Sequence, residues 1–348
     1  MSENQQTQNN AEKVELKLSV ASSPHLGSID STPGIMVDVI IALLPALAAA
    51  VWFFGARALT LTLATVASTV GFEALYRKCM KLPSTVGDLS AVVTGILLAM
   101  CLPANTPYWV AILGGAFAII VVKQLFGGLG KNFLNPALAG RVFLFSSFPA
   151  FISKYTEPIR SAWPSIWGVN LDAESAATPM KFIHSGKLPE GVSIQQLMVG
   201  EQAGCLGEVA ALMLIVGGIY LVLRKVISPR IPLCYIGTVA VLTYLFPLGG
   251  IARGDWMLYN LLSGGLMLGA IFMATDYVTS PVTPTGRTVY AIGCGALTVF
   301  LRYFGIYPEA VSFSILVMNI LVWSLDKAFM PHRFGTPWFQ KKAKEASK

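Results

Sequence analysis

The spacing of long apolar segments constrains this chain more than any other feature of its sequence. Apolar runs recur along most of the 348 residues, with short polar segments between them. A helix needs about 20 apolar residues to cross the hydrocarbon core of a bilayer. Hydrophobic residues make up 54% of the chain and charged residues only 12%, unlike an ordinary soluble domain. The pattern predicts an all-α polytopic membrane protein.

Cutting the chain by length and flanking polarity predicts ten transmembrane helices, at 35–54, 58–76, 86–102, 108–126, 136–151, 206–223, 231–248, 256–274, 288–304 and 310–325. An odd number of spans in each half would give the halves opposite orientations, so we expect two inverted five-helix repeats. The predicted organisation is an amino-terminal tail (1–34), a first repeat (35–151), one long polar loop (152–205), a second repeat (206–326) and a basic tail (327–348).

Two glycine-punctuated segments support an internal repeat. TGILLAMCLPANTP at 94–107 and GGLMLGAIFMATD at 264–276 occupy matching places in the third and eighth spans. Such segments are typical of the discontinuous helices in inverted-repeat transporters. The alternative is that glycine-rich spans resemble one another by composition alone.

Lys and Arg residues predict the orientation, because cytoplasmic loops are enriched in them. With the amino terminus inside, inner segments hold 17 basic residues and outer segments seven, with Arg141 inside a span. Both termini are therefore predicted to be cytoplasmic, and the loop 152–205 extracytoplasmic. The net charge of +7 is spread between and after apolar spans, which argues against a nucleic-acid surface.

Acidic residues near the span ends are candidates for an ion pathway. Carboxylates kept within a membrane zone often mark such pathways, and Asp38, Glu73 and Asp88 are the candidates here. The alternative for each is a helix cap or a group that faces headgroup water. The cysteines and histidines have no metal-ligand spacing, so no metal site is expected.

Two segments on the predicted cytoplasmic side could form one pseudo-symmetric site. GGLGKNFLNPALAGR (127–141) combines glycines with an Asn-Pro helix start, and ATDYVTSPVTPTGR (274–287) is its counterpart in the second half. Free backbone N–H groups at such helix starts favour an anion or a polar ring edge. The alternative is that both are ordinary turns. The Asn135-Pro136-Ala137 triplet occurs once, whereas a water channel would need it in both halves.

A short pattern in the long loop has a chemical purpose. In DAESAATPM, Asp172 is followed after two residues by Ser175-Ala176-Ala177-Thr178. This resembles the signature that flavin transferases recognise when they join the phosphate of FMN to a threonine hydroxyl. We expect this stretch to be mostly exposed, and Pro179 to keep Ala177 and Thr178 out of a helix.

From about residue 16 to residue 338, the chain resembles the D subunit of the Rnf complex and its relative, the B subunit of the sodium-translocating NADH:quinone oxidoreductase. The resemblance rests on SSPH (22–25), GDLSAVVTGILLAMCLP (87–103), GKNFLNPA (130–137), SAATP and ATDYVTSP. The family commonly has other residues at Leu134, Ala176 and Tyr277, but the acceptor hydroxyl is kept. The quinone-reducing relative typically has a longer amino-terminal extension than the one in this sequence. This difference favours the Rnf subunit.

The resemblance implies a membrane electron-transfer subunit of an ion-translocating ferredoxin:NAD oxidoreductase, not active alone and without catalytic residues of its own. It implies FMN on Thr178 through a phosphoester, with Asp172, Ser175, Ala176 and Ala177 as the attachment motif. It also implies a second, noncovalent flavin such as riboflavin, for which the candidate residues are Lys131, Asn132, Asn135, Thr275, Asp276 and Thr279.

The same resemblance implies partners and a location. Electrons would pass between reduced ferredoxin and NAD chemistry in other membrane and peripheral subunits, coupled to Na⁺ or H⁺ translocation in the cell (inner) membrane. A flavin transferase would complete maturation. Three alternatives remain, namely a quinone-reducing B-type subunit, a solute channel or secondary transporter with an unmodified loop, and a scaffold without flavin on Thr178.

Overall fold

The computed structural model describes residues 31–155, 158, 178–189, 192–200, 202–208, 211–305 and 309–330. All contacts reported below lie within the unit Thr32–Lys348. The described residues are mostly helical, and their only β pairing outside helices is an isolated bridge between Pro103 and Cys205. The prediction of an all-α chain with several apolar helices is confirmed at this level.

The first part of the chain forms α1 (Thr32–Phe54), α2 (Ala56–Cys79), the 3₁₀ turn η1 (Val86–Asp88), α3 (Ser90–Met100), α4 (Tyr108–Ala116), the π-helical η2 (Phe117–Gln124), α5 (Pro136–Ser147) and α6 (Pro149–Ile152). The rest forms α7 (Pro179–His184), α8 (Ile194–Val199), α9 (Ala211–Leu223), α10 (Arg230–Leu245), α11 (Arg253–Leu262), α12 (Leu266–Leu268), the π-helical η3 (Gly269–Met273), α13 (Pro284–Phe304) and α14 (Val311–Ala328).

Few of these helices are long enough to cross a bilayer alone. Within the described residues, α1, α2 and α14 have the required length and apolar composition, and the bent pair of α11 with α12–η3 would be a fourth span. The ten spans predicted from the sequence are therefore not seen as ten long helices. The third one is much shorter than expected, because α3 has 11 residues and so rises only roughly 16 Å.

Both glycine-punctuated segments are interrupted in the structure. α3 ends at Met100 and non-helical residues follow as far as Pro107. The chain bends by 64° between α11 and α12, where Gly264 and Gly265 have φ values of +73° and +66°. Only glycine adopts this left-handed conformation without steric cost, which explains why the break falls here.

Two helix starts agree with their sequence signals. The side chain of Asn135 accepts hydrogen bonds from the N–H groups of Ala137 and Leu138, and Pro136 is the first residue of α5. Thr283 caps α13 in the same way, with Pro284 as its first residue. Asn or Thr followed by Pro is a favoured helix start, because the side-chain oxygen accepts a free N–H and Pro lacks one.

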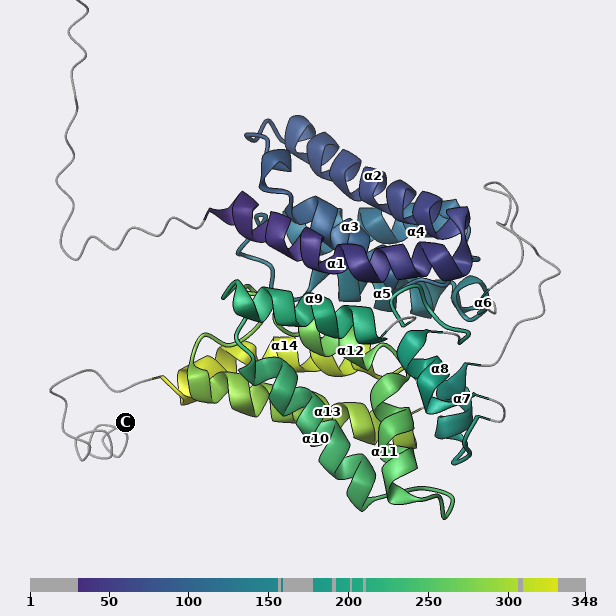
Figure 1. Cartoon of the computed structure of the whole chain (residues 1–348). Helices are drawn as coiled ribbons and strands as arrows, with labels where there is room; N and C mark the ends of the chain where they lie inside the picture. Colours follow the sequence, from purple (N-terminus) through teal and green to yellow (C-terminus); the bar gives the residue numbers. More distant parts are fainter. Residues whose placement is uncertain are drawn as a thin grey trace, which may run out of the picture. The chain divides into compact units, whose positions relative to one another are not determined.

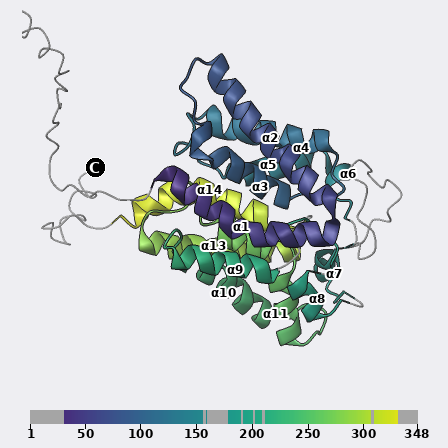
Figure 2. The same cartoon turned by 45° about the horizontal axis from the view of Figure 1, so that its top comes forward.

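α1 begins and α14 ends on the same side of the helical unit, at the left of Figure 1, whereas α6, α7 and α8 lie at the right. Figure 2 shows the same separation from a second direction. α1 packs along α9, and a side chain at Gly217 would lie 2.1 Å from the Ala42 carbonyl oxygen. Small residues at such contacts are typical of helices in membranes.

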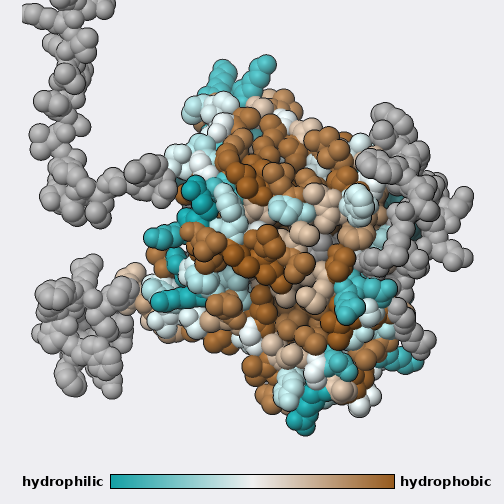
Figure 3. All heavy atoms as spheres, in the orientation of Figure 1, coloured by the Kyte–Doolittle hydropathy of each residue, from teal (hydrophilic) through white to brown (hydrophobic). Residues whose placement is uncertain are grey.

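A broad apolar surface covers the middle of this unit, and polar residues gather toward its sides (Figure 3). Large apolar side chains point outward from several helices, among them Trp52, Leu233 and Trp323, which are 81%, 68% and 73% exposed. In a soluble protein such a surface would mark an interface or an aggregation hazard. Its extent agrees with a protein surrounded by lipid or by other membrane subunits.

The segment predicted as one long polar loop contains packed structure. α7 and α8 share an apolar cluster with α11, which buries Met180, Ile183, Leu197 and Trp256. α8 begins with a reciprocal capping box between Ser193 and Gln196, an arrangement that satisfies two free N–H groups at a helix start.

Three basic residues that the orientation prediction counted in inner or outer segments are buried. Lys123 lies within η2, Arg57 within α2 and Arg302 within α13, each no more than 3% exposed. Removing them takes one residue from the inner count and two from the outer count, so the basic bias remains. Arg302 donates to the carbonyl oxygens of Asn260 and Ser263 and thereby satisfies backbone acceptors at the break after α11.

Candidate functional site

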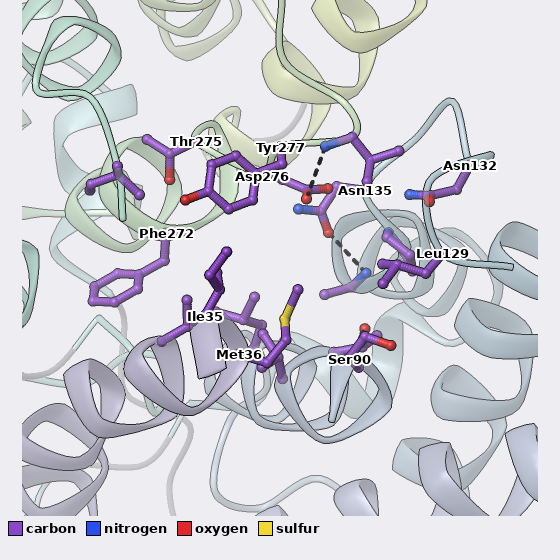
Figure 4. A pocket seen from close by; sticks show the side chains of 18 of the residues that line it. Ile35, Met36, Ser90, Leu129, Asn132, Asn135, Phe272, Thr275, Asp276 and Tyr277 are labelled. Atoms are coloured by element: carbon purple, nitrogen blue, oxygen red, sulfur yellow. Dashed lines mark hydrogen bonds between the residues drawn. The ribbon is translucent and has the colours of Figure 1, made fainter. Parts of the chain in front are cut away.

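The two segments predicted to form one site do line a common pocket (Figure 4). The pocket holds about 780 Å³ of space between atoms, including solvent at its mouth. Ile35, Met36, Leu129 and Phe272 are among its apolar walls. Mostly apolar pockets with a few polar groups are typical of small-molecule and cofactor sites.

Four of the six residues predicted for a second flavin line this pocket, namely Asn132, Asn135, Thr275 and Asp276. Thr279 is not among the lining residues, but its hydroxyl donates to Asp276. Lys131 is exposed and is not among the lining residues. The two predicted segments therefore meet at one pocket, but not every predicted residue lines it.

Asn135 joins the two segments. While its Oδ1 caps α5, its Nδ2 donates to the carbonyl oxygen of Met273, 3.2 Å away at the end of η3. The side chain is 3% exposed. Asn135 therefore uses its amide to position the pocket walls.

Asn132 has an atom left for a ligand. Its Nδ2 donates to the Leu134 carbonyl oxygen, but its buried Oδ1 has no hydrogen-bond partner among the described residues. A buried acceptor without a partner costs about 1–3 kcal/mol. A ring N–H donor in the pocket would remove that cost.

Lys123 and Ser90 also line the pocket, and sequence reasoning missed both. The Lys123 ammonium lies 2.9 Å from a Glu73 carboxylate oxygen and 2.6 Å from the Ser90 hydroxyl. The sequence features that indicate the Lys123–Glu73 pair are a single lysine in the mostly apolar run of η2 and an acidic residue in α2.

The three predicted ion-pathway acids all have partners. Glu73 accepts from Lys123, Gln124 and Thr85. Asp38 accepts from Tyr220 and from Arg224 at 3.2 Å. Asp88 accepts from the Ser90 N–H and hydroxyl, just before α3. Asp88 agrees with the alternative of a helix cap, whereas Glu73 and Asp38 each pair with a basic side chain, which the alternative did not include.

Thr178, the predicted flavin acceptor, lies at the start of α7. Its backbone is extended, with ψ of 149°, as expected before a proline, and its hydroxyl makes no capping bond. The residue is 5% exposed, so the expectation of an exposed threonine is wrong. The following residues are drawn into the apolar cluster with α11, where Met180 is buried. Asp172, Ser175, Ala176 and Ala177 lie outside the described residues.

Residues 19–335 match the model of the NQR2, RnfD, RnfE family. The chain belongs to this family. The D subunit of the Na⁺-translocating ferredoxin:NAD⁺ oxidoreductase complex of Acetobacterium woodii is 44% identical over 95% of this chain and 99% of its own length.

Further members of the family are similar in sequence to this chain along most of its length. The D subunit of the proton-translocating ferredoxin:NAD⁺ oxidoreductase complex of Clostridium ljungdahlii is 38% identical over 91% of this chain and 96% of its own. The D subunit of an ion-translocating oxidoreductase complex of Halorhodospira halophila is 35% identical over 91% and 95%. Two of these relatives are named for different ions, so membership in the family leaves the ion open.

Proposed function

We propose that this protein is the D-type membrane subunit of an Rnf-like complex that couples electron transfer between ferredoxin and NAD⁺ to ion translocation. The observation that carries the proposal is the match to relatives named as D subunits over 91–95% of this chain. The other subunits would hold the ferredoxin and NAD⁺ chemistry and the remaining redox centres. This chain would contribute flavin sites and part of the membrane domain.

The first flavin would be FMN, attached to Thr178. A phosphoester between the threonine oxygen and the FMN phosphate would be formed by a flavin transferase, with a net mass gain of FMN less water. The support is the DAESAATPM pattern and a Thr178 hydroxyl that is not used as a helix cap. Packing of α7 against α11 would hold the attached group close to the helical unit. The ring would supply the redox chemistry.

Intact-protein mass spectrometry tests this proposal directly. The denatured protein, coexpressed with an active flavin transferase, is expected to carry one FMN, and peptide mapping should place it on Thr178. An unmodified mass, when the transferase modifies another substrate in the same cells, would favour a channel, a transporter or a scaffold instead. A B-type quinone-reducing subunit would also carry the FMN, but its complex would reduce quinone rather than NAD⁺.

The second flavin, riboflavin or a similar noncovalent flavin, would occupy the pocket between α1, α5 and η3 (Figure 4). Asn132 would accept from a ring N–H, and Phe272, Ile35 and Met36 would contact the apolar part of the ring. Asp276, held by the Val278 N–H and the Thr279 hydroxyl, would set the charge at the polar edge.

Asn132→Ala is expected to lower noncovalent flavin severalfold, because it removes the unpaired acceptor in the pocket. Loss of a hydrogen bond of about 1–2 kcal/mol corresponds to a roughly 5- to 30-fold weaker affinity. The measurement is flavin released from purified protein by denaturation, with covalent FMN as the internal control. Unchanged noncovalent flavin would remove Asn132 from the site.

We further propose ten membrane-crossing segments in two inverted repeats, with both termini cytoplasmic and the region 152–205 extracytoplasmic. The support is that the third span of each half is interrupted, after α3 in the first half and between α11 and α12 in the second. The basic residues that remain in loops have the inside bias. Short helices in series, rather than ten long ones, would cross the bilayer.

Thiol labelling tests this orientation. Cys79 is an exposed native cysteine on the proposed cytoplasmic side, whereas Lys187 is exposed beyond α7. In whole cells an impermeant thiol reagent should leave Cys79 unmodified and should label Lys187→Cys in a Cys79→Ser background. Inside-out vesicles should give the reverse pattern. Labelling of Cys79 in whole cells would overturn the orientation.

A further inference from the structure

A second cluster of charged side chains lies away from the flavin pocket. It joins Arg141 of α5, Glu208 at the end of the segment 202–208, and Glu309 just before α14. Arg141 is six residues beyond Asn135, roughly 9 Å along the helix axis. All three are buried, with exposed fractions of 7%, 8% and 7%.

Glu309 is well supplied with donors. Arg141 Nη2 pairs with its Oε2, and the Tyr155 hydroxyl donates to its Oε1. Arg141 Nη2 also lies 3.7 Å from the sulfur of Cys205. The guanidinium is thus directed at Glu309, and it is the only basic group paired with either acid in the described part of the chain.

The Glu208 carboxylate has fewer hydrogen-bond donors than that of Glu309. Its Oε2 accepts from the Cys205 N–H at 3.4 Å, but its Oε1 has no hydrogen-bond partner among the described residues and lies 3.9 Å from Arg141 Nη2. Its surroundings leave little room, since a side chain at Gly204 would lie 2.8 Å from Oε2. A buried carboxylate oxygen is therefore left without a donor.

The cluster has more negative than positive charge. Two carboxylates face one guanidinium, whereas the Glu73–Lys123 pair near the flavin pocket is balanced. An uncompensated buried charge costs several kcal/mol. One additional positive charge would neutralise the cluster.

Two small pockets border the cluster. One small pocket borders Arg141 and Glu309, and another borders Glu208 and Gly265. One oxygen of each glutamate and the sulfur of Cys205 lie within 4.8 Å of one another. The second pocket reaches the break between α11 and α12.

We propose that Glu208 and Glu309 bind one exchangeable monovalent cation, either Na⁺ or a proton, between them. Carboxylate oxygens suit a hard cation, and the charge excess matches a single positive charge. Arg141 beside Cys205 disfavours a transition metal on that thiol. The binding site does not depend on flavin, but any part that it plays in transport rests on the proposed function.

Infrared difference spectroscopy on the intact membrane-reconstituted complex tests this site. Spectra are recorded on exchange of Na⁺ for K⁺ at constant pH, and on a pH change at constant Na⁺. The wild type, Glu208→Gln and Glu309→Gln are compared, with Asp255→Asn as the control. Asp255 is an exposed acid of α11 outside the cluster.

For Na⁺, the carboxylate bands should shift on ion exchange in the wild type and in Asp255→Asn, and this shift should be lost in both glutamine variants. For a proton, a protonated carboxyl band should change with pH in the wild type and vanish in both variants. If neither exchange gives a signal that depends on Glu208 or Glu309, the cluster only holds α5 to α14 and the proposal is overturned.

Either glutamine variant neutralises the cluster, so one of them suffices if the other does not accumulate in the membrane. Thr178→Val should keep the cation signal. This separates failure of the cation site from failure of the flavin assignment.

Discussion

Thr178→Val is expected to abolish covalent FMN and, with it, electron transfer through the assembled complex. Valine keeps the volume and β-branching of threonine but lacks the hydroxyl that would carry the phosphoester. Because that hydroxyl does not cap α7, the substitution removes no helix cap and should leave insertion and assembly intact. The measurements are the intact mass and in-gel flavin fluorescence, which should fall from one FMN per chain to none.

Thr178→Ser is the matched control. It keeps an acceptor hydroxyl and removes one buried methyl group, at a cost of about 1 kcal/mol. Covalent FMN on the serine variant but not on the valine variant would assign the acceptor by its chemistry. Covalent FMN that persists on the valine variant would show that the flavin is attached elsewhere.

Lys123→Met should cause the largest loss of stability. Glu73 is completely buried and Lys123 is 2% exposed, so the variant leaves a carboxylate without its counter-ion. Breaking a buried pair by removing one partner costs about 3–5 kcal/mol. We expect a loss of this size in the free energy of unfolding measured in mixed micelles.

The double variant Glu73→Gln with Lys123→Met distinguishes charge from packing. It removes both charges, while the glutamine can still bond to Thr85 and Gln124, which contact Glu73 in the wild type. We expect it to recover most of the lost stability, to within about 1–2 kcal/mol of the wild type. A double variant as unstable as Lys123→Met would mean that packing of the Lys123 chain, not its charge, supports η2.

Local signals in the sequence predicted local structure well. The Asn135-Pro136 and Thr283-Pro284 pairs mark the first residues of α5 and α13, because capping needs only neighbouring residues. The paired glycines at 264 and 265 mark the bend of the eighth span, because their backbone conformation is intrinsic to glycine. The two pocket segments meet as predicted, although they follow the fourth and the eighth predicted spans, which are not matching spans of the two repeats.

Long-range pairing was out of reach of the sequence. Arg141 and Glu309 are 168 positions apart, and Lys123 and Glu73 are 50 apart, so no local pattern indicates that they meet. Lys123 was counted among the inner basic residues, although the predicted span 108–126 includes it, and its pairing with Glu73 was not predicted. The burial of Thr178 depends on its neighbours in α7 packing against α11, a tertiary contact that a seven-residue pattern does not contain.

The single carboxamide of Asn135 couples the stability of the first turn of α5 to the position of the end of η3. One end of the amide holds the first N–H groups of α5, and the other holds the last carbonyl oxygen of η3. If η3 moved away and the side chain followed it, Oδ1 would leave the start of α5. The two walls of the pocket are therefore mechanically coupled. Movement of η3 away from α5 would loosen the first turn of α5, the helix that also carries Arg141.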